Sequence, residues 1–286
     1  MVNKGFDIEM GYSDSFGDIN VSLRGNLSYL QNEVVYLGNG IDFLSGGAGF
    51  QSSTYPITRT AVGQPYNSFF GFQTRGIFQN QEEIDSYVNS EGVVIQPNAV
   101  PGDFRYEDID DSGSINADDR KFLGSSIPKY TFGLTLNLDY KNFDLLVFSQ
   151  GAAGNKIFQG LRRLDISNAN YQTEALNRWT GEGTSNSFPR LSNDDNNNNF
   201  TNPSDFYLEN GDYLRIKTIQ LGYSLPRNVI DNVGLTRLRV YLTGENLFTF
   251  TKYTGFDPEI GGGIFGIDRG FYPQARTGLV GLNIQF

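Results

Sequence analysis

The chain has 286 residues, a formal net charge of −10, no cysteine and no histidine. These counts exclude a disulfide framework, a thiolate metal site, a histidine-containing catalytic triad and a histidine-ligated zinc site. The acidic balance argues against a nucleic-acid partner, because phosphate binding needs a clustered basic face. No stretch of the sequence approaches the ~18 consecutive apolar residues of a membrane helix.

The N-terminal segment alternates apolar and polar residues with a period of two, which is the pattern of β-strands. Residues 6–12 and 19–29 predict a long hairpin with a turn at Ser13 to Asp18, and strands longer than the usual ~5–6 residues. Residues 1–10 carry no apolar secretion signal, so we expect a fragment of a longer exported protein. The apolar rows of the hairpin are Phe6, Ile8, Met10 and Tyr12, then Ile19, Val21, Leu23, Gly25, Leu27 and Tyr29.

The next hundred or so residues are mostly irregular in pattern. Residues 31–66 are rich in Gly, Ser and Thr and predict a loop. A short aromatic strand is expected at 67–78, and a helix at 81–88 with Asn80 as its N-cap. Residues 89–128 form a long excursion, and its part from 101 to 128 carries an acidic motif.

The clearest strand spans residues 130–140. A tyrosine stands at each end of its apolar row, as an aromatic girdle at two membrane interfaces requires. Lys141-Asn142 predicts a minimal turn, and Phe143 begins the return strand. The apolar row is Tyr130, Phe132, Leu134, Leu136, Leu138 and Tyr140, and the polar row is Lys129, Thr131, Thr135, Asn137 and Asp139.

The C-terminal half contains one more long loop and three more strands. The loop, 151–203, is expected to hold a helix at Thr173 to Trp179, and its Asn-rich tract at 193–199 is expected to be mobile because it is too polar to pack. In the strand at 211–225 the apolar phase slips, which predicts a bulge near Lys217–Thr218. The last two strands carry Leu238, Val240 and Leu242, and then Val280, Leu282, Ile284 and Phe286.

About eight strands, joined alternately by short turns and very long loops, have the asymmetry of outer-membrane barrels. A soluble β-sandwich with one solvated face would alternate as well. That fold does not account for long apolar rows bracketed by aromatic residues, or for an apolar strand that ends the chain at Phe286. The sequence therefore predicts an all-β fold, an antiparallel transmembrane β-barrel segment with long extracellular loops in contact with the lipid bilayer of a Gram-negative outer membrane.

Five segments of the chain resemble, in the same order, the SusC/RagA family of TonB-linked (TonB-dependent) outer-membrane transporters. The resemblance covers nearly the whole chain. The segments are SFFGFQTRGIFQNQEEID at 68–85, the stretch 101–158, YLRIKTIQLGYSLP at 213–226, LRVYLTGENLFTFTKYTGFDPEIGG at 238–262, and YPQARTGLVGLNIQF at 272–286.

The resemblance implies a nutrient importer of the Bacteroidota type. Its barrel would be larger than this chain, with an N-terminal plug pulled by the TonB complex and a SusD-like surface lipoprotein that captures glycans or peptides. Plug and TonB-binding segment are absent from the 286 residues. Residues 1–286 would then be the C-terminal part of the barrel, forming an open, strongly curved sheet with unpaired edges at its first and last strands. The row ending at Phe286 resembles the signal read by the barrel assembly machinery.

The acidic motif in residues 101–128 fits the template of a calcium-binding loop. Alternate residues would supply oxygen ligands, Gly113 would allow the sharp turn, and Ile115 would anchor the loop to a core. A serine at the fifth position and Asp119 in place of the usual glutamate would weaken binding. A solvated acidic turn is the alternative. The expected Ca²⁺ ligands are Asp108, Asp110, Ser112, Ser114, Asn116 and Asp119.

Two further groups are candidates for contact with a substrate. Four cations on polar rows could line the lumen, or could pair with acids across strands: Arg215, Lys217, Arg237 and Arg239. Aromatic residues in the loops could stack on sugar rings, or could pack locally: Phe70, Phe72, Tyr171, Trp179 and Tyr207.

Nutrient import without covalent chemistry is the function that these features favour. A soluble carbohydrate-binding β-domain is the alternative from another class. A hydrolase is not expected, because the sequence lacks histidine and a nucleophile elbow, and Glu245 and Asp257 do not form a persuasive acid pair.

Overall fold

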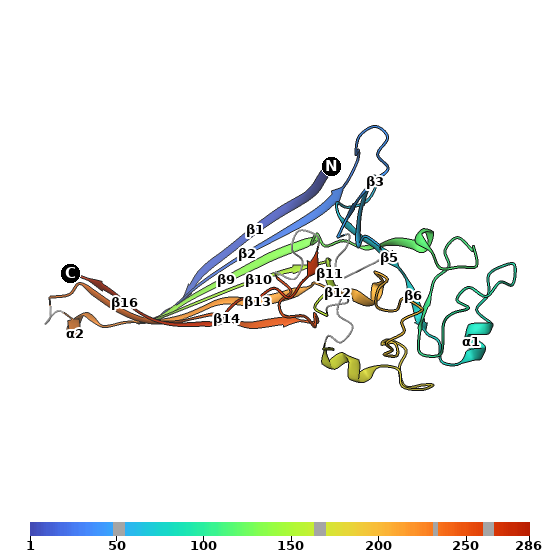
Figure 1. The fold of residues 1–286 in the computed structure, drawn as a ribbon. Coiled ribbons are helices and arrows are strands. Elements are labelled where there is room, and N and C mark those ends of the chain that lie inside the picture. The colour runs from blue at the N-terminus through green and yellow to red at the C-terminus, as the bar shows by residue number, and fades with distance from the viewer. Residues whose placement is uncertain (48–54, 163–169, 231–233, 260–265) are drawn as a thin grey trace.

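The computed structural model describes residues 1–47, 55–162, 170–230, 234–259 and 266–286. The seven longest strands form one open antiparallel sheet, called the long sheet, in the order β1-β2-β9-β10-β13-β14-β16 (Figure 1). Among the described residues, the edge strands β1 and β16 each have one neighbour in this sheet, as expected. Its strands are β1 (Val2–Phe16), β2 (Ile19–Glu33), β9 (Tyr130–Tyr140), β10 (Phe143–Ala153), β13 (Tyr213–Ser224), β14 (Arg237–Thr251) and β16 (Thr277–Gln285).

The long sheet has short connections at one end and long ones at the other (Figure 1). The predicted two-residue turn at Lys141-Asn142 is confirmed, since Tyr140 pairs with Phe143. The first hairpin also has a two-residue turn, because Phe16 pairs with Ile19, so the longer turn predicted from Ser13 is wrong. At the opposite end the chain leaves the sheet in segments 34–129, 154–212 and 252–276, called the loop region.

Cross-strand pairing places the predicted apolar rows on one face. Leu27 pairs with Phe132, and the same row reaches the last strand, where Leu282 pairs with Val240. Lys217 is an extra residue in β13, because its neighbours Ile216 and Thr218 pair with consecutive residues of β10. This bulge confirms the predicted phase slip: it returns both halves of the strand to the same apolar face.

Two bands of aromatic side chains cross the apolar face. At the turn end, Phe143 pairs with both Tyr140 and Tyr223, with the rings of Phe143 and Tyr223 4.7 Å apart. At the loop end, the ring of Tyr29 lies 5.2 Å from that of Tyr130. Ten residues of β-strand span about 33 Å, which a tilt of about 35–45° reduces to about 23–27 Å, the height of an outer-membrane apolar band.

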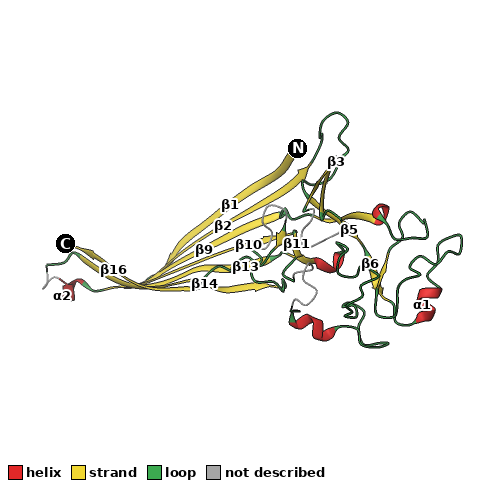
Figure 2. Cartoon of the chain, viewed as in Figure 1, coloured by secondary structure: helices red, strands yellow, loops and turns green. Residues whose placement is uncertain are grey.

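The loop region holds the remaining elements, which are short (Figure 2). No helix among the described residues is long and apolar enough to span a membrane. The strands are β3 (Phe43–Gly46), β4 (Thr58–Ala61), β5 (Ser68–Phe72), β6 (Thr74–Ile77), β7 (Phe104–Tyr106), β8 (Arg120–Gly124), β11 (Lys156–Gln159), β12 (Leu208–Asn210) and β15 (Ile267–Asp268). The helices are α1 (Gln81–Asp85) and the 3-10 turns η2 (Ala117–Asp119), η3 (Thr173–Asn177) and η4 (Asp205–Tyr207), while α2 (Arg227–Ile230) lies between β13 and β14.

Several predictions for the loop region need correction. Residues 31–66 contain two paired strands, β3 and β4. The aromatic segment 67–78 forms β5 and β6, which belong to two small sheets outside the long sheet, so the long sheet has seven strands where about eight were expected. Asn80 caps α1 as predicted, by accepting from the Glu83 amide, but the helix ends at Asp85.

The Asn-rich tract packs against the loop region instead of standing free. Asn199 is 2% exposed; its side chain accepts from the Phe104 amide (2.8 Å) and donates to Asp103 (2.8 Å). Asn197 donates to the Phe104 carbonyl (2.9 Å). The expectation of an unpacked tract is wrong because primary amides can satisfy buried backbone groups, which hydrophobicity alone does not register.

The hydrophobic clusters found among the described residues all lie in the loop region. One brings Phe69 of β5 against Phe158 of β11 and Ile267 of β15, so it joins three of the connecting segments. A second packs Phe72, Ile77, Phe104 and Tyr106 together, and a third contains Phe78, Ile84 and Ala99. Segments far apart in the chain are thereby held in one body at the end of the long sheet.

Candidate functional site

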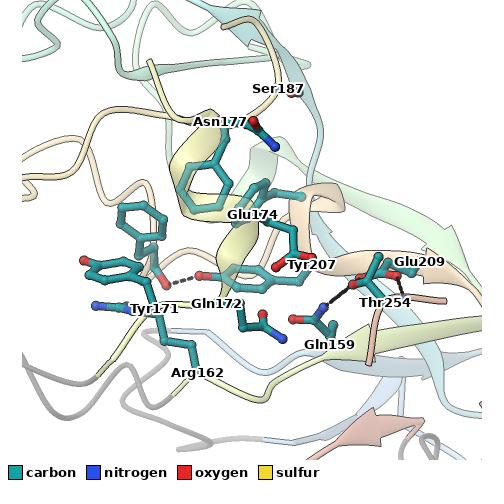
Figure 3. Close-up of a pocket in the computed structure, with 13 residues that line it drawn as sticks. Gln159, Arg162, Tyr171, Gln172, Glu174, Asn177, Ser187, Tyr207, Glu209 and Thr254 are labelled. Carbon is teal, nitrogen blue, oxygen red and sulfur yellow. Dashed lines mark hydrogen bonds between the residues drawn. The ribbon is translucent and has the colours of Figure 1, made fainter. Parts of the chain in front are cut away.

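A cavity of about 350 Å³ opens in the loop region, within the segment 154–212 and against Thr254 of the segment 252–276 (Figure 3). Gln159 of β11 and Glu209 of β12 line one side, and Tyr171 and η3 line another. Its volume lies at the lower end of the range of small-molecule pockets, which is about 300–1,000 Å³. The cavity can therefore hold one or two rings of a larger ligand.

Aromatic side chains make up much of the wall. Tyr207 is 8% exposed, and its ring stacks on Phe158 with centroids 4.9 Å apart. Its hydroxyl donates to the Phe200 carbonyl (2.8 Å), one of the dashed lines in Figure 3. Burial raises the pKa of Tyr207 far above its usual value. Tyr207 is thus a fixed, neutral part of the wall.

Polar side chains hold a second part of the wall in place. Glu209 accepts from Gln159 Nε2 (2.8 Å), from the Thr254 amide (2.7 Å) and from the Thr254 hydroxyl (2.7 Å). These bonds tie β11 and β12 to the segment that follows β14. Glu209 is therefore committed to structure.

Arg162 contributes a cation to the cavity. Its guanidinium carbon lies 4.0 Å from the centroid of the Tyr171 ring and 5.4 Å from that of Phe200. The Nε atom is buried and has no hydrogen-bond partner among the residues that the structure describes. A guanidinium that rests on ring faces keeps its in-plane N–H groups available for an acceptor.

The structure distributes the predicted loop aromatics between this cavity and the hydrophobic clusters. Tyr171 and Tyr207 both line the cavity. Trp179 packs against the second cluster and donates from its indole Nε1 to Gln79 (3.1 Å). Phe70 and Phe72 are 7% and 1% exposed. Contact with a substrate stays a prediction for all five.

Sequence reasoning missed Arg162, Glu209 and Thr254. No local motif marks these three residues, because they are more than forty residues apart in the chain and meet only after the loop region has folded. Arg162 stands in the stretch LRRLD, which carries no spacing signal. The only indication from the sequence was the general expectation that binding residues lie in loops.

The acidic loop brings its predicted ligands together. Carboxylate oxygens of Asp108, Asp110 and Asp119 lie within 4.8 Å of one another. Two ligand oxygens on one Ca²⁺ ion, each at about 2.3–2.6 Å, can be at most about 5 Å apart, so the arrangement has the right size. The Ser112 hydroxyl and the Asn116 amide both donate to the Ser114 carbonyl (3.1 and 3.2 Å), which places the remaining ligand candidates beside one another.

The environment of the acidic loop also agrees with the template. The Gly113 amide donates to Asp108 (2.9 Å), and Ile115 packs against the second hydrophobic cluster. Asp119 is fully buried and accepts from the amides of Ile109 (2.8 Å) and Asn116 (2.7 Å). Burial raises the pKa of Asp119, and hydrogen bonds from Ser112 lower that of Asp110.

Three of the four predicted lumen cations are paired with acids. Arg215 is 3% exposed and donates to Asp257 (2.5 Å) and Glu259 (2.6 Å), and Lys217 donates to Glu259 (2.9 Å). Elsewhere in the sheet, Arg239 pairs with Asp144 of β10. Arg237 lies exposed at the turn end of β14. The geometry therefore favours a structural role for these cations, as partners of acids, over a role in lining the lumen.

The terminal row lies on the apolar face, as predicted. Val280 pairs with Leu242, Leu282 with Val240, and Ile284 with Leu238. Their exposed fractions are 75%, 62% and 47%, and Phe286 is 90% exposed. Recognition of this row during assembly stays a prediction.

Comparisons with known proteins agree with this architecture, although no protein-family model matches the chain. TonB-dependent receptor P3 of Formosa agariphila is 31% identical over 297 residues, covering 99% of this chain and 28% of that protein. TonB-dependent receptor SusC of Bacteroides thetaiotaomicron is 27% identical over 278 residues, covering 94% of this chain and 25% of that protein. The solved RagAB peptide transporter superposes with a TM-score of 0.75 at 23% identity, over 99% of this chain and 29% of that chain.

This chain therefore spans less than a third of the length of the curated relatives that it matches. The likeness nevertheless runs through both the long sheet and the loop region, since 99% of the chain is covered. An apolar sheet face between two aromatic bands explains why such a chain resides in the outer membrane. The chain belongs to the family of TonB-dependent receptors that includes SusC, and it forms a β-barrel segment of the bacterial outer membrane.

Proposed function

We propose that this chain supplies part of the barrel wall and of the extracellular loops of a transporter that imports nutrient oligomers, glycans or peptides, across the outer membrane. The observation that carries the proposal is the combination of a lipid-facing sheet with a packed loop region that contains a cavity. Two named relatives support the chemistry: SusC is a TonB-dependent receptor, and RagAB is a peptide transporter. Import would need binding and release of the oligomer, without covalent chemistry.

The partners follow from the same proposal. A SusD-like surface lipoprotein would cover the loop region and deliver the oligomer, and the TonB complex would supply energy through a part of the transporter outside these 286 residues. The barrel assembly machinery would recognise the terminal row, Val280 to Phe286, whose side chains are presented on an exposed edge strand.

Deletion of the gene tests the proposal. The bacterium should lose growth on at least one oligomer that is too large for porins, and it should keep growth on the corresponding monomer. Loss of TonB should have the same effect. Unchanged growth on every oligomer tested, with the protein present in the outer membrane of the parent strain, would contradict import.

We further propose that the acidic loop binds one Ca²⁺ ion, which would neutralise clustered carboxylates and hold the excursion against the second hydrophobic cluster. The geometry supports this through the convergence of Asp108, Asp110 and Asp119. Calorimetric titration of the full-length protein in detergent should show Ca²⁺ binding that is lost in Asp108→Asn/Asp110→Asn. The matched control is Asp118→Asn, an exposed acid of the same loop outside the ligand positions. Equal binding by the double variant, or no binding by the parent, rejects the site.

A further inference from the structure

Arg162 is the cation of the cavity, and it has no counter-ion in the described part of the chain. It makes no ion pair or hydrogen bond with any described residue, and its Nε is buried without an acceptor. Tyr171 and Phe200 hold the guanidinium in place through their ring faces. Because Arg162 also lines the cavity, the outer N–H groups of its guanidinium can receive an acceptor that arrives with a ligand.

Neither of the two acids that line the cavity, Glu174 and Glu209, is a counter-ion of Arg162. The Glu209 carboxylate is engaged by Gln159 and Thr254. Glu174 is exposed on η3 and is not paired with Arg162. The planar fork of an arginine binds a carboxylate through two parallel N–H groups, which is the strongest hydrogen-bonded arrangement available to it.

The rest of the wall suits a sugar ring. Tyr171, Phe188 and Phe206 contribute aromatic surface, against which the C–H face of a sugar can lie. Gln172 and Asn177 bring primary amides whose side chains make no hydrogen bond with any described residue. Each amide offers both donors and an acceptor, which matches neighbouring hydroxyl groups.

A peptide is the other substrate class of the proposed transporter, and the cavity suits it less well. Extended peptides are commonly held through main-chain hydrogen bonds to a free strand edge. Gln159 belongs to β11, the central strand of its small sheet, with β12 on one side and β15 on the other. This strand has no free edge to offer. The edge strand β12 lines the cavity through Glu209, but the side chain of Glu209 is already bound to Gln159 and Thr254, so the binding test below includes a peptide.

We propose that the cavity binds a sugar residue that carries a carboxylate, with Arg162 on the carboxylate and the aromatic wall on the ring, so that the transporter takes acidic, uronate-containing glycans. This inference rests on the proposed import function and names the substrate class. It goes beyond that function, because import alone does not require an anionic substrate.

Calorimetry on the full-length transporter purified in detergent tests the inference, with digalacturonate as the probe. Digalacturonate should bind, and its carboxyl-reduced, neutral counterpart should bind at least about tenfold more weakly, as expected for a lost charge-assisted pair. Arg162→Gln should weaken digalacturonate binding by a similar factor, and Arg162→Lys should weaken it less. Arg227→Gln, which removes the same charge from an exposed position in α2, should leave it unchanged.

Three results would overturn the inference: no binding of digalacturonate, equal affinity for the neutral disaccharide, or equal affinity of the Arg162→Gln variant. Tighter, Arg162-dependent binding of an acidic dipeptide would overturn the assignment to a sugar. Heat-modified migration in gels shows that each variant is folded. Growth assays separate this inference from import: growth on neutral oligomers that depends on the gene, without uronate binding, would reject the inference and leave import standing.

Discussion

The long sheet and the loop region bury their apolar residues in opposite ways. In the long sheet, large apolar side chains such as Leu242 and Val280 are 56% and 75% exposed. In the loop region, Phe69 and Tyr106 are each 1% exposed and belong to hydrophobic clusters. The same hydrophobic effect accounts for both, because one region meets lipid and the other meets water.

Polar groups follow the same division. On the face of the long sheet opposite to the apolar rows, Arg239 pairs with Asp144, and Arg215 and Lys217 pair with acids of the segment after β14. In the loop region, buried polar side chains such as Asn199 satisfy backbone groups. Each region therefore removes charge and unsatisfied hydrogen bonds from its own apolar environment.

The largest effect is expected at the junction of the two regions. Arg215 of β13 is bound to Asp257 and Glu259 of the segment after β14, with side chains of Arg215 and Asp257 that are 4% and 2% exposed. Arg215→Met should destabilise the protein by about 3–5 kcal/mol, because it leaves buried acids unpaired. Thermal unfolding in detergent measures this. Arg239→Met is the matched control, and its loss should be smaller because the Asp144 side chain is 29% exposed.

The same junction should lose stability in acid. Burial opposes ionisation of Asp257, but Arg215 and two backbone amides hold its pKa below the usual value. Because the pKa of Asp257 is lower in the folded state, its carboxylate stabilises the folded protein at pH values above the unfolded pKa of about 3.9. That contribution is lost as the pH falls through the folded pKa. Unfolding followed between pH 6 and pH 2.5 should show this loss in the parent and a smaller one in Arg215→Met. Identical pH profiles would contradict the role of the pair.

A charged substitution should destabilise the protein in the lipid-facing row and should be tolerated in the opposite row. Leu136 lies midway between the aromatic bands on the apolar face, and Asn137 is its neighbour on the other face. Leu136→Arg should cost about 2–4 kcal/mol, the cost of an arginine near the bilayer midplane. Its yield of folded protein in the outer membrane should fall, and Asn137→Arg should keep a near-parental yield. Equal yields of the two variants would contradict the assignment of one face to lipid and the other to water.

A smaller effect is expected in the loop region at Asn199. Asn199→Ala leaves the Phe104 amide and Asp103 without one partner each, at a cost of about 1–3 kcal/mol. Hydrogen exchange should become faster in β7 and remain unchanged in β9. The exposed Asn196→Ala serves as the control. Unchanged exchange in β7 would mean that the Asn-rich tract does not support the cluster beneath it.

Sequence reasoning succeeded where the chain obeys a simple period. The alternation in residues 130–140 predicted strand, face and turn, because every second side chain meets lipid. The phase slip at Lys217 predicted a bulge because one extra residue exchanges the two faces. The aromatic ends of the rows predicted the two bands for the same reason.

The loop region resisted prediction because its order depends on contacts between distant segments. The composition of the NDDNNNN tract predicts mobility. Its side-chain amides are ordered by hydrogen bonds to Asp103 and Phe104, which lie nearly a hundred residues earlier in the chain. Likewise, Arg162 became a candidate only when the rings of Tyr171 and Phe200 were found beside its guanidinium in the cavity. The acidic loop was the exception, since its chemistry is contained in twelve consecutive residues.

The central claim is that the long sheet crosses the outer membrane with its apolar rows in lipid. These 286 residues contain no cysteine, so a direct test needs cysteine to be replaced only where it occurs elsewhere in the full-length protein. Single cysteines placed along β9 in the full-length protein, reconstituted in lipid, can carry a spin label whose collisions with oxygen and with a water-soluble nickel complex are measured. Labels at Phe132, Leu134, Leu136 and Leu138 should meet oxygen and exclude nickel, and labels at Thr131, Thr135, Asn137 and Asp139 should show the reverse. Equal access of the nickel complex to both rows would contradict the account.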